Sequence, residues 1–209
     1  MRILAFTDLH GSARELDALA AKAAGTGIDA LLCAGDFTRH GAHAADVLDR
    51  LAAARRPLYA VPGNHEDGLL LAGLRARFDF LRDVNGRWED LGGAWVCGFG
   101  GPEAFRRRLP QDAGEPCPEI DALWRKLPAS ARSGAKPVVF LTHYPPLDTA
   151  LDEAGPGVHG GSERVRKFID AVRPALVVCG HIHRAFGRED RIGPTRVINP
   201  GPQGLLVEV

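Results

Sequence analysis

Cysteine is scarce and widely scattered in this 209-residue chain. The four cysteines are Cys33, Cys97, Cys117 and Cys179, and no two of them form a Cys-x-x-Cys pair. A disulfide framework or a zinc–thiolate site requires closely and regularly spaced cysteines. Three of the four also lie in apolar runs. We therefore expect reduced thiols in the core, with neither a disulfide framework nor a thiolate metal site.

An excess of either charge is also missing. Lys plus Arg and Asp plus Glu number 26 each, which gives a net charge of +0. A neutral chain has no overall field that attracts DNA or an anionic membrane. Because the sequence also has no basic stripe and no aromatic stacking platform, we expect neither a membrane nor a nucleic acid as partner. The sequence leaves the oligomeric state open.

Long apolar runs are absent as well. The first run ends at Asp8, too early for the apolar region of a signal peptide, and no later window approaches the length of a membrane span. These features predict a cytoplasmic protein. With 45% apolar and 25% charged residues the composition is typical of globular proteins, and the length predicts one domain, residues 1–209, with a substantial core.

The first half alternates between short apolar runs and helix-like segments. Strands are expected at 3–7, 30–34 and 58–61, and helices at 13–24 and 42–54. Ser12 stands where a helix cap is needed for the first of these helices. Such alternation favours right-handed βαβ units and a parallel sheet that is buried on both faces.

The second half is less regular. Strands are expected at 94–99, 138–142 and 175–179, and helices at 69–78 and from a Ser162 cap to about residue 172. The stretch 101–136 is rich in Pro, Arg and Glu, so we expect a surface excursion at the rim of a site, with one short helix at 120–127. Extended pieces at 184–188, 195–198 and 205–209 predict that the second half closes with antiparallel strands.

Polar motifs follow directly after five of the predicted strands. The most informative is Pro62-Gly63-Asn64-His65-Glu66, which places an amide, an imidazole and a carboxylate in consecutive positions. Its companions are Asp8-Leu9-His10-Gly11, Gly35-Asp36, Thr142-His143 and Gly180-His181-Ile182-His183. In parallel sheets, the loops at the carboxyl ends of strands form the ligand crevice. We therefore expect the five motifs to converge on one site.

Seven side chains in these motifs are typical metal ligands: Asp8, His10, Asp36, Asn64, His143, His181 and His183. Carboxylate, imidazole and amide oxygen suit Mn, Fe, Co or Zn. Seven ligands are too many for one four-coordinate ion, whereas one shared carboxylate gives each of two ions four ligands. Phosphatases and nucleases hold such pairs about 3.5–4 Å apart, which makes hydroxide available near neutral pH and draws charge from the phosphoryl oxygens.

One histidine of the motifs is left over. His65 adjoins the candidate ligand Asn64, so it is the natural group to contact phosphate or to protonate the leaving oxygen. A single histidine at a strand end is more often an ordinary polar residue than a functional one. The ordered set of five motifs is what favours the metal site.

Several other polar residues have both a functional and a structural interpretation. His159 lies in a Gly-rich loop, as a substrate contact or as an exposed turn residue. Arg39 and His40 either bind phosphate or belong to a loop that is simply polar. Arg106-Arg107-Arg108 either binds an anionic substrate or forms a solvated basic turn. Asn199-Pro200-Gly201 fits a type II turn, with its backbone near the crevice as the alternative.

In order and spacing, the five motifs resemble the signature blocks of the calcineurin-like metallophosphoesterase superfamily. Further stretches resemble its small, uncapped bacterial and archaeal members, described as Icc-related or predicted phosphoesterases: Gly35-Asp36-Phe37-Thr38, Thr142-His143-Tyr144-Pro145-Pro146, His159-Gly160-Gly161-Ser162 and Asn199-Pro200-Gly201-Pro202. The resemblance implies a four-layer α/β/β/α sandwich, in which two facing mixed β-sheets are flanked by helices and a dimetal site lies at the C-terminal ends of strands.

The resemblance also implies a role for each site residue. The first ion would be held by Asp8, His10, Asp36 and His183, and the second by Asp36, Asn64, His143 and His181. Asp36 would thus bridge the two ions. Asn64 and His65 would also bind substrate, with His65 as the acid that contacts the leaving group, and Glu66 would orient His65.

The expected activity is hydrolysis of a phosphodiester, or else a phosphomonoester, in a small molecule by hydroxide from the metal pair. Manganese is the expected metal, with Fe, Zn, Co and Ni as alternatives. Two other functions stay open: a non-catalytic metal-binding scaffold of the same fold, and a nuclease. A scaffold would be expected to have lost ligands or His65, and the neutral chain disfavours long nucleic acids. The physiological substrate is not readable from the sequence.

Overall fold

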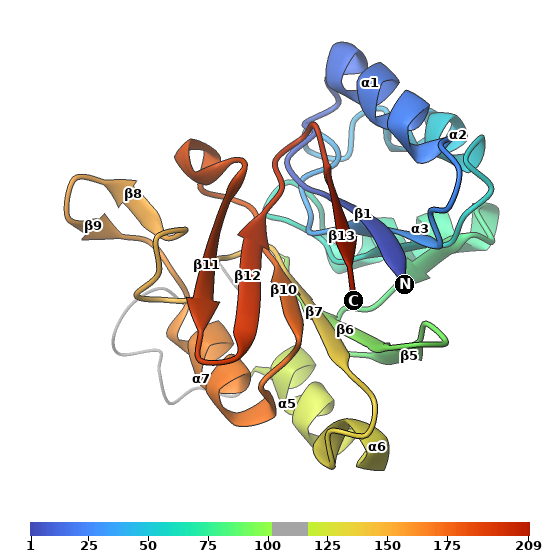
Figure 1. Ribbon diagram of the computed structural model, residues 1–209. Coiled ribbons are helices and arrows are strands. Elements are labelled where there is room, and N and C mark those ends of the chain that lie inside the picture. The colour runs from blue at the N-terminus through green and yellow to red at the C-terminus, as the bar shows by residue number, and fades with distance from the viewer. Residues whose placement is uncertain (102–116) are drawn as a thin grey trace.

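The computed structural model describes residues 1–101 and 117–209 (Figure 1). Two large mixed sheets, one of five strands and one of six, lie in the middle of the molecule, and helices cover their outer faces. This arrangement confirms the sandwich of two sheets flanked by helices. No helix in the described ranges combines the length and the apolar character that crossing a membrane requires.

The first sheet combines the N-terminal half with the last strand. Its order is β13 (Leu205–Glu208), β1 (Arg2–Phe6), β2 (Ala30–Cys33), β3 (Leu58–Ala60) and β4 (Leu81–Asp83). The strands from β1 to β4 are mutually parallel, as the alternation of strands and helices predicts. The final strand pairs antiparallel with β1, which brings the two chain ends together (Figure 1). That strand therefore closes the first sheet, whereas we expected it in the second half.

The second sheet has antiparallel strands at its two edges and parallel strands in its centre. Its order is β11 (Arg188–Ile192), β12 (Thr195–Asn199), β10 (Leu176–Val178), β7 (Val138–Thr142), β6 (Trp95–Phe99) and β5 (Trp88–Asp90). The prediction of an extended segment at 184–188 is wrong. A short 3₁₀ helix, η2 (His183–Ala185), occupies its start, because the Phe186 N–H donates to the His183 carbonyl.

The described helices are α1 (Ala13–Ala23), α2 (Ala44–Ala52), α3 (Gly68–Arg77), α5 (Pro118–Arg125), α6 (Ala129–Arg132) and α7 (Glu163–Val172). The two predicted caps are confirmed, since the Ser12 hydroxyl accepts from the Glu15 N–H and the Ser162 hydroxyl from the Val165 N–H. A small hairpin, β8 (Glu153–Gly155) and β9 (Val158–His159), precedes α7 and projects beside β11 (Figure 1).

The prediction of a surface excursion at 101–136 is wrong for residues 117–136. Ile120 and Leu123 of α5 are buried in the apolar cluster against the outer face of the second sheet. This segment therefore belongs to a helical layer, and its apolar residues recur three apart because one helix face is buried. Residues 102–116 lie outside the described ranges.

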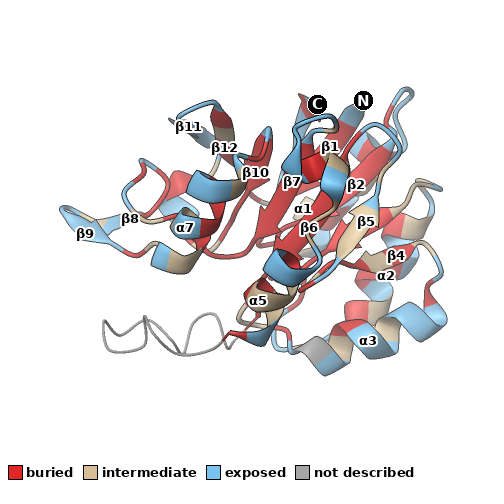
Figure 2. Ribbon diagram, turned by 90° about the horizontal axis from the view of Figure 1, so that it is seen from below, coloured by how far each residue is buried: buried red, intermediate tan, exposed pale blue. Residues whose placement is uncertain are grey.

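Three apolar layers hold the sandwich together. Along β1, Leu4 and Phe6 pack against α1 and α2, whereas Ile3 and Ala5 face the second sheet. The strands of the second sheet divide their side chains in the same way between the inter-sheet layer and the helices α5 and α7. This alternation has the two-residue period of a strand. Figure 2 shows the result, with buried strands and largely exposed outer helix faces.

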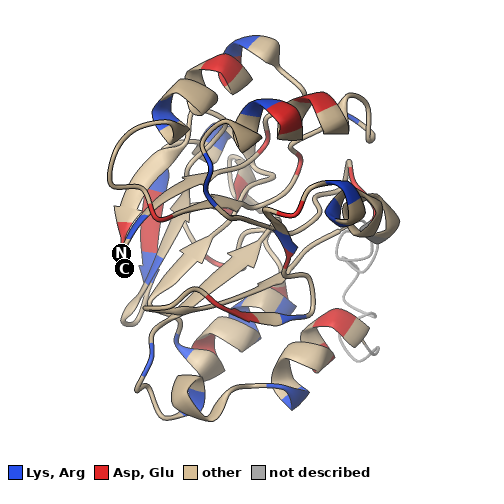
Figure 3. Cartoon of the chain, turned by 90° about the vertical axis from the view of Figure 1, so that its right-hand side faces the viewer, with Lys and Arg blue, Asp and Glu red and all other residues tan. Residues whose placement is uncertain are grey.

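Charged residues lie mainly on the outer layers. In Figure 3 the helices carry interspersed basic and acidic segments, while the strands between them are largely uncharged. The mixture on this face agrees with the balanced composition.

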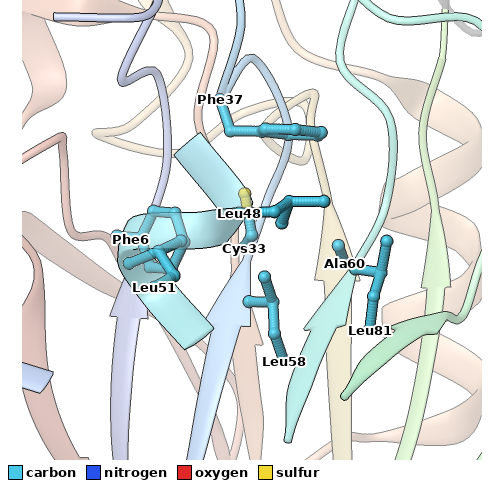
Figure 4. Close-up of a pocket in the computed structure, with 8 residues that line it drawn as sticks. All are labelled: Phe6, Cys33, Phe37, Leu48, Leu51, Leu58, Ala60 and Leu81. Atoms are coloured by element: carbon cyan, nitrogen blue, oxygen red, sulfur yellow. The ribbon is translucent and has the colours of Figure 1, made fainter. Parts of the chain in front are cut away.

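A small gap remains in the core beneath α2 (Figure 4). The gap has no room for a water molecule and is lined only by apolar side chains: Phe6, Cys33, Phe37, Leu48, Leu51, Leu58, Ala60 and Leu81. Ligand pockets need a few polar groups that fix the orientation of a ligand. We therefore assign this gap to imperfect packing.

Leu48→Ala should destabilise the fold by about 2–5 kcal/mol, because it enlarges a gap that the surrounding sheet cannot close. Leu48 is 1% exposed, whereas the control residue Leu69 is 82% exposed. Leu69→Ala should change the free energy of unfolding by less than about 0.5 kcal/mol. Denaturant unfolding measures both values. Equal effects would contradict the assignment of Leu48 to the core.

Candidate metal centre

The five polar motifs converge at one edge of the sandwich. They follow β1, β2, β3, β7 and β10, whose carboxyl ends meet there because the strands run parallel within each sheet. Backbone hydrogen bonds join neighbouring loops: the Asp8 N–H donates to the Gly35 carbonyl, and the Gly180 N–H to the His143 carbonyl. All seven predicted ligands therefore come from loops that brace one another.

Three of the ligands form the first half of the centre. The Nε2 atoms of His10 and His183 lie 3.2 Å apart, and they lie 3.6 and 3.4 Å from Oδ1 of Asp8. The other Asp8 oxygen, Oδ2, accepts hydrogen bonds from the Thr7 hydroxyl and the His181 N–H. Oδ1 is buried and has no hydrogen-bond partner among the described residues. A buried carboxylate oxygen that faces two imidazole nitrogens fits a bound cation.

The second half of the centre is built around Asn64. Its Oδ1 lies 3.0 Å from Nε2 of His143 and 3.0 Å from Nδ1 of His181. His143 is fully buried, and its Nδ1 lies 2.9 Å from the Ala34 carbonyl, to which it donates. That bond leaves Nε2 to face the centre as a ligand atom.

Asp36 lies between the two halves. Its Oδ1 accepts from the His65 N–H at 2.8 Å, which fixes the carboxylate and leaves Oδ2 to face the centre. Oδ2 lies 3.3 Å from Nε2 of His143 and 3.9 Å from Nε2 of both His10 and His65. One oxygen thus borders both halves, which is the arrangement expected for a bridging ligand. Ligand atoms within 4.8 Å of one another form three overlapping groups: Asp8, His10 and His183; His10, Asp36 and His65; and Asp8, Asp36 and His143.

Backbone strain is concentrated in this centre. Four residues here have a positive φ, a backbone conformation that residues other than glycine rarely adopt. They are Asp8 (+54°), His10 (+47°), Asp36 (+52°) and His181 (+66°). Each such residue costs about 1–3 kcal/mol and persists only where the surrounding structure enforces it. The loops are therefore shaped to direct these side chains inward at the expense of local stability.

Glycines allow the loops to approach so closely. A side chain at Gly63 would overlap the Asp36 carboxylate, and one at Gly180 would overlap Thr7 and Asp8. The Gly-Asn-His and Gly-His-x-His motifs thus owe their glycines to the contact between loops.

Electrostatics also favour cations here. Burial alone would raise the pKa of the Asp8 carboxyl, but the nearby imidazoles of His10 and His183 hold that pKa well below its usual range. Burial would likewise lower the pKa of His143, yet its contact with Asp36 raises that pKa to about 9. Without a metal, a proton on His143 balances the charge of the buried Asp36 carboxylate. Bound ions would take over this role and require the imidazoles to be neutral.

The Glu66 side chain joins the loop after β2 to the loop after β3. Its Oε2 accepts from the N–H groups of Asp36 and Gly63 at 2.8 and 2.9 Å, and its Oε1 accepts from the N–H and the hydroxyl of Thr38 at 2.8 and 2.6 Å. Burial raises the pKa of the Glu66 carboxyl, and these hydrogen bonds partly offset that rise. The expectation that Glu66 orients the His65 ring is therefore wrong. Its bonds hold the backbones of two loops in place.

His65 lies at the open side of the centre. Its ring is 4.9 Å from the ring of His10 and 4.2 Å from that of His40, measured between centroids. Burial lowers the pKa of His65, while Asp36 acts in the opposite direction. Nδ1 of His65 is buried without a hydrogen-bond partner among the described residues. The Nε2 atom faces the centre, 3.9 Å from Oδ2 of Asp36.

Three supporting residues were not assigned a role by the sequence. Thr7 donates to Asp8, Thr38 donates to Glu66, and the buried Asn199 amide donates to the carbonyls of Gly180 and Ile182. The sequence pattern at Asn199 indicates a turn, with a backbone near the crevice as the alternative. For Thr7 and Asn199 the available signal was their position at a predicted strand end, whereas Thr38 lies four residues beyond one; the partners of all three are distant in sequence.

The remaining candidates fall outside the ligand cluster. His159 lies on β9, where its Nδ1 is 2.8 Å from the buried Asp152 carboxylate, and the described structure places it with that residue and not with the metal ligands. Arg39 is exposed in the loop that follows Asp36. Arg106-Arg107-Arg108 belongs to residues 102–116, outside the described ranges.

Comparisons with known proteins agree with this geometry. No curated protein matches the chain. The structure of TT1561 from Thermus thermophilus is similar, with a TM-score of 0.70, 22% identity, and coverage of 97% of this chain and 90% of that one. A dimetal phosphatase from Danio rerio has a TM-score of 0.63 and 13% identity, with coverage of 95% and 86%. At these identities the likeness shows a shared fold.

The family comparison is more specific, because it includes the motifs themselves. The model described as calcineurin-like phosphoesterase matches residues 1–185, a range that contains all seven candidate ligands and His65. The carboxylate, imidazole and amide groups that meet at the centre are those the family resemblance implied. The chain therefore belongs to the calcineurin-like phosphoesterase family.

Proposed function

We propose that this protein hydrolyses phosphodiesters, and less readily phosphomonoesters, of small molecules with the help of two divalent ions. The observation that carries the proposal is the position of Asp36 Oδ2, which borders both halves of the centre. Asp8, His10, Asp36 and His183 would hold one ion, and Asp36, Asn64, His143 and His181 the other. Manganese is our first choice of metal, because the donors are nitrogen and hard oxygen without thiolate.

Divalent ions at such a site supply a nucleophile near neutral pH and offset charge on the phosphoryl group. The protein side chains do the rest. Asn64 and His65, which adjoin the centre on one loop, would contact the phosphoryl oxygens. Nε2 of His65 would donate to the oxygen of the leaving group, and hydrogen bonding at that atom is worth most as its charge develops.

We also propose that His159 contacts the substrate. The Asp152 carboxylate is fully buried and accepts from the N–H groups of Asp148, Thr149 and Gly161 as well as from His159 Nδ1. This network fixes the loop and raises the pKa of His159 through the Asp152 hydrogen bond. The other nitrogen, Nε2, is left to meet a substrate that extends beyond the metal centre.

The alternative functions are less well supported. A non-catalytic scaffold needs neither the complete ligand set nor His65, yet both are present and converge. A nuclease would need a path for a long polyanion, and the charges on the face of Figure 3 are mixed. Small-molecule esters therefore remain the better proposal.

The direct test is hydrolysis of bis-p-nitrophenyl phosphate and p-nitrophenyl phosphate by metal-stripped protein, with Mn, Fe, Co, Zn, Ni or Mg returned in turn. We expect metal-dependent turnover with the diester preferred. Turnover of the monoester alone would overturn the diesterase assignment. Protein that binds two ions and hydrolyses neither reporter would favour the scaffold.

Asp36→Asn should lower kcat at least about 100-fold, because it removes the charge shared by the two halves, and metal stabilisation of this kind is worth several kcal/mol. We expect the ion content, measured by elemental analysis, to fall below two per chain. Asp170→Asn, at an exposed position on α7, is the matched control and should leave both values unchanged. Near-normal turnover in Asp36→Asn would be incompatible with a bridging role.

For His65→Ala we expect kcat to fall by about 10²–10⁴-fold, the usual effect of losing a proton donor. The ion content should stay the same, because the ring is proposed to contact substrate and not metal. His43→Ala is a suitable control, since the His43 side chain is 78% exposed and pairs with Asp46. Loss of an ion in parallel with activity would reassign His65 as a ligand.

A further inference from the structure

A second imidazole lies directly beyond His65. The ring centroids of His40 and His65 are 4.2 Å apart with an interplanar angle of 43°, and His40 is exposed. The sequence left His40 open between a phosphate contact and a residue of a polar loop. Its position beside the one non-ligand histidine of the centre favours a functional role.

The backbone at His40 is unusual for a histidine. Residues 39–42 form a tight turn in which the Ala42 N–H donates to the Arg39 carbonyl at 3.1 Å. Both central residues have positive φ, +53° for His40 and +76° for Gly41, which defines a type I′ turn. Asn-Gly is the favoured pair for this turn, because asparagine tolerates the left-handed region best. A histidine at position 40 therefore sacrifices local stability, as residues at functional sites often do.

The turn is also tied to the catalytic loops. The Thr38 hydroxyl accepts from the Gly41 N–H at 3.1 Å and donates to Glu66 at 2.6 Å. Glu66 in turn holds the backbone of Asp36. This chain of bonds fixes the His40 turn relative to both Asp36 and His65, so the contact between the two rings is built into the site.

The groups are ordered outward from the centre. Asp36 Oδ2 lies 3.9 Å from Nε2 of His65, and the His65 ring is followed by the exposed His40 ring. A phosphoryl group at the metal ligands meets His65 first, and whatever is esterified to it extends toward His40. We infer that His40 packs against the ester substituent of the substrate and thereby selects esters with a flat leaving group. This inference rests on the proposed function.

The test compares two probes on metal-loaded protein by titration calorimetry: inorganic phosphate and phenylphosphonate, which carries a ring on a bond that the enzyme does not hydrolyse. His40→Asn suits the turn and should fold normally. We expect it to weaken phenylphosphonate binding about three- to tenfold, the size of one ring contact, and to leave phosphate binding unchanged. The control His43→Asn, also at a left-handed position (φ +58°), should change neither.

The outcomes separate the possible roles of His40. Equal weakening of both probes would mean that His40 binds the phosphate itself, and no weakening would mean that the ring contacts nothing on the substrate; either result overturns the inference. Wild-type protein that binds two ions but neither probe would refute the proposed function together with the inference. Kinetics on the diester reporter should agree, with a lower kcat/KM in His40→Asn and unchanged ion content.

Discussion

The buried Asp36 carboxylate is the constraint on which the rest of the site depends. It is 2% exposed, and an unpaired carboxylate at such a position would cost several kcal/mol. The structure compensates with the His65 N–H on one oxygen and imidazoles around the other. Together with Asp36, these groups come from the loops after β1, β2, β3 and β7. The conformations of the four loops therefore depend on one another.

Glu66 is a second buried carboxylate, so the site has more buried negative charge to compensate. Its bonds hold the Asp36 and Gly63 backbones, which places two acidic groups close together and raises the pKa of the Glu66 carboxyl through burial and the Asp36 charge. Two neighbouring buried acids repel each other unless cations lie nearby. A proton on His143 meets this demand in the metal-free protein, and bound ions would meet it in its place. Metal binding and the order of these loops would then be coupled.

The sandwich provides rigid supports for these strained loops. Three apolar layers fix the strands, so that loops with four left-handed non-glycine residues at the centre are held in shape by packing elsewhere. The close approach of Gly63 to Asp36 and of Gly180 to Asp8 then brings both sheets into one centre. The candidate site thus carries backbone strain, and packing in the core offsets its cost.

The sequence by itself determined the parallel strands, the caps at Ser12 and Ser162, and the set of seven candidate ligands with His65. These features depend on local periodicity and on polar residues at strand ends, which neighbours along the chain encode. Only the tertiary structure decided the partners of Glu66, the buried face of α5, the pairing of β13 with β1 and the position of His40 over His65. Each of these depends on contacts between segments far apart in sequence. Such contacts are fixed by loop conformation and packing, for which the sequence of either segment alone carries no signal.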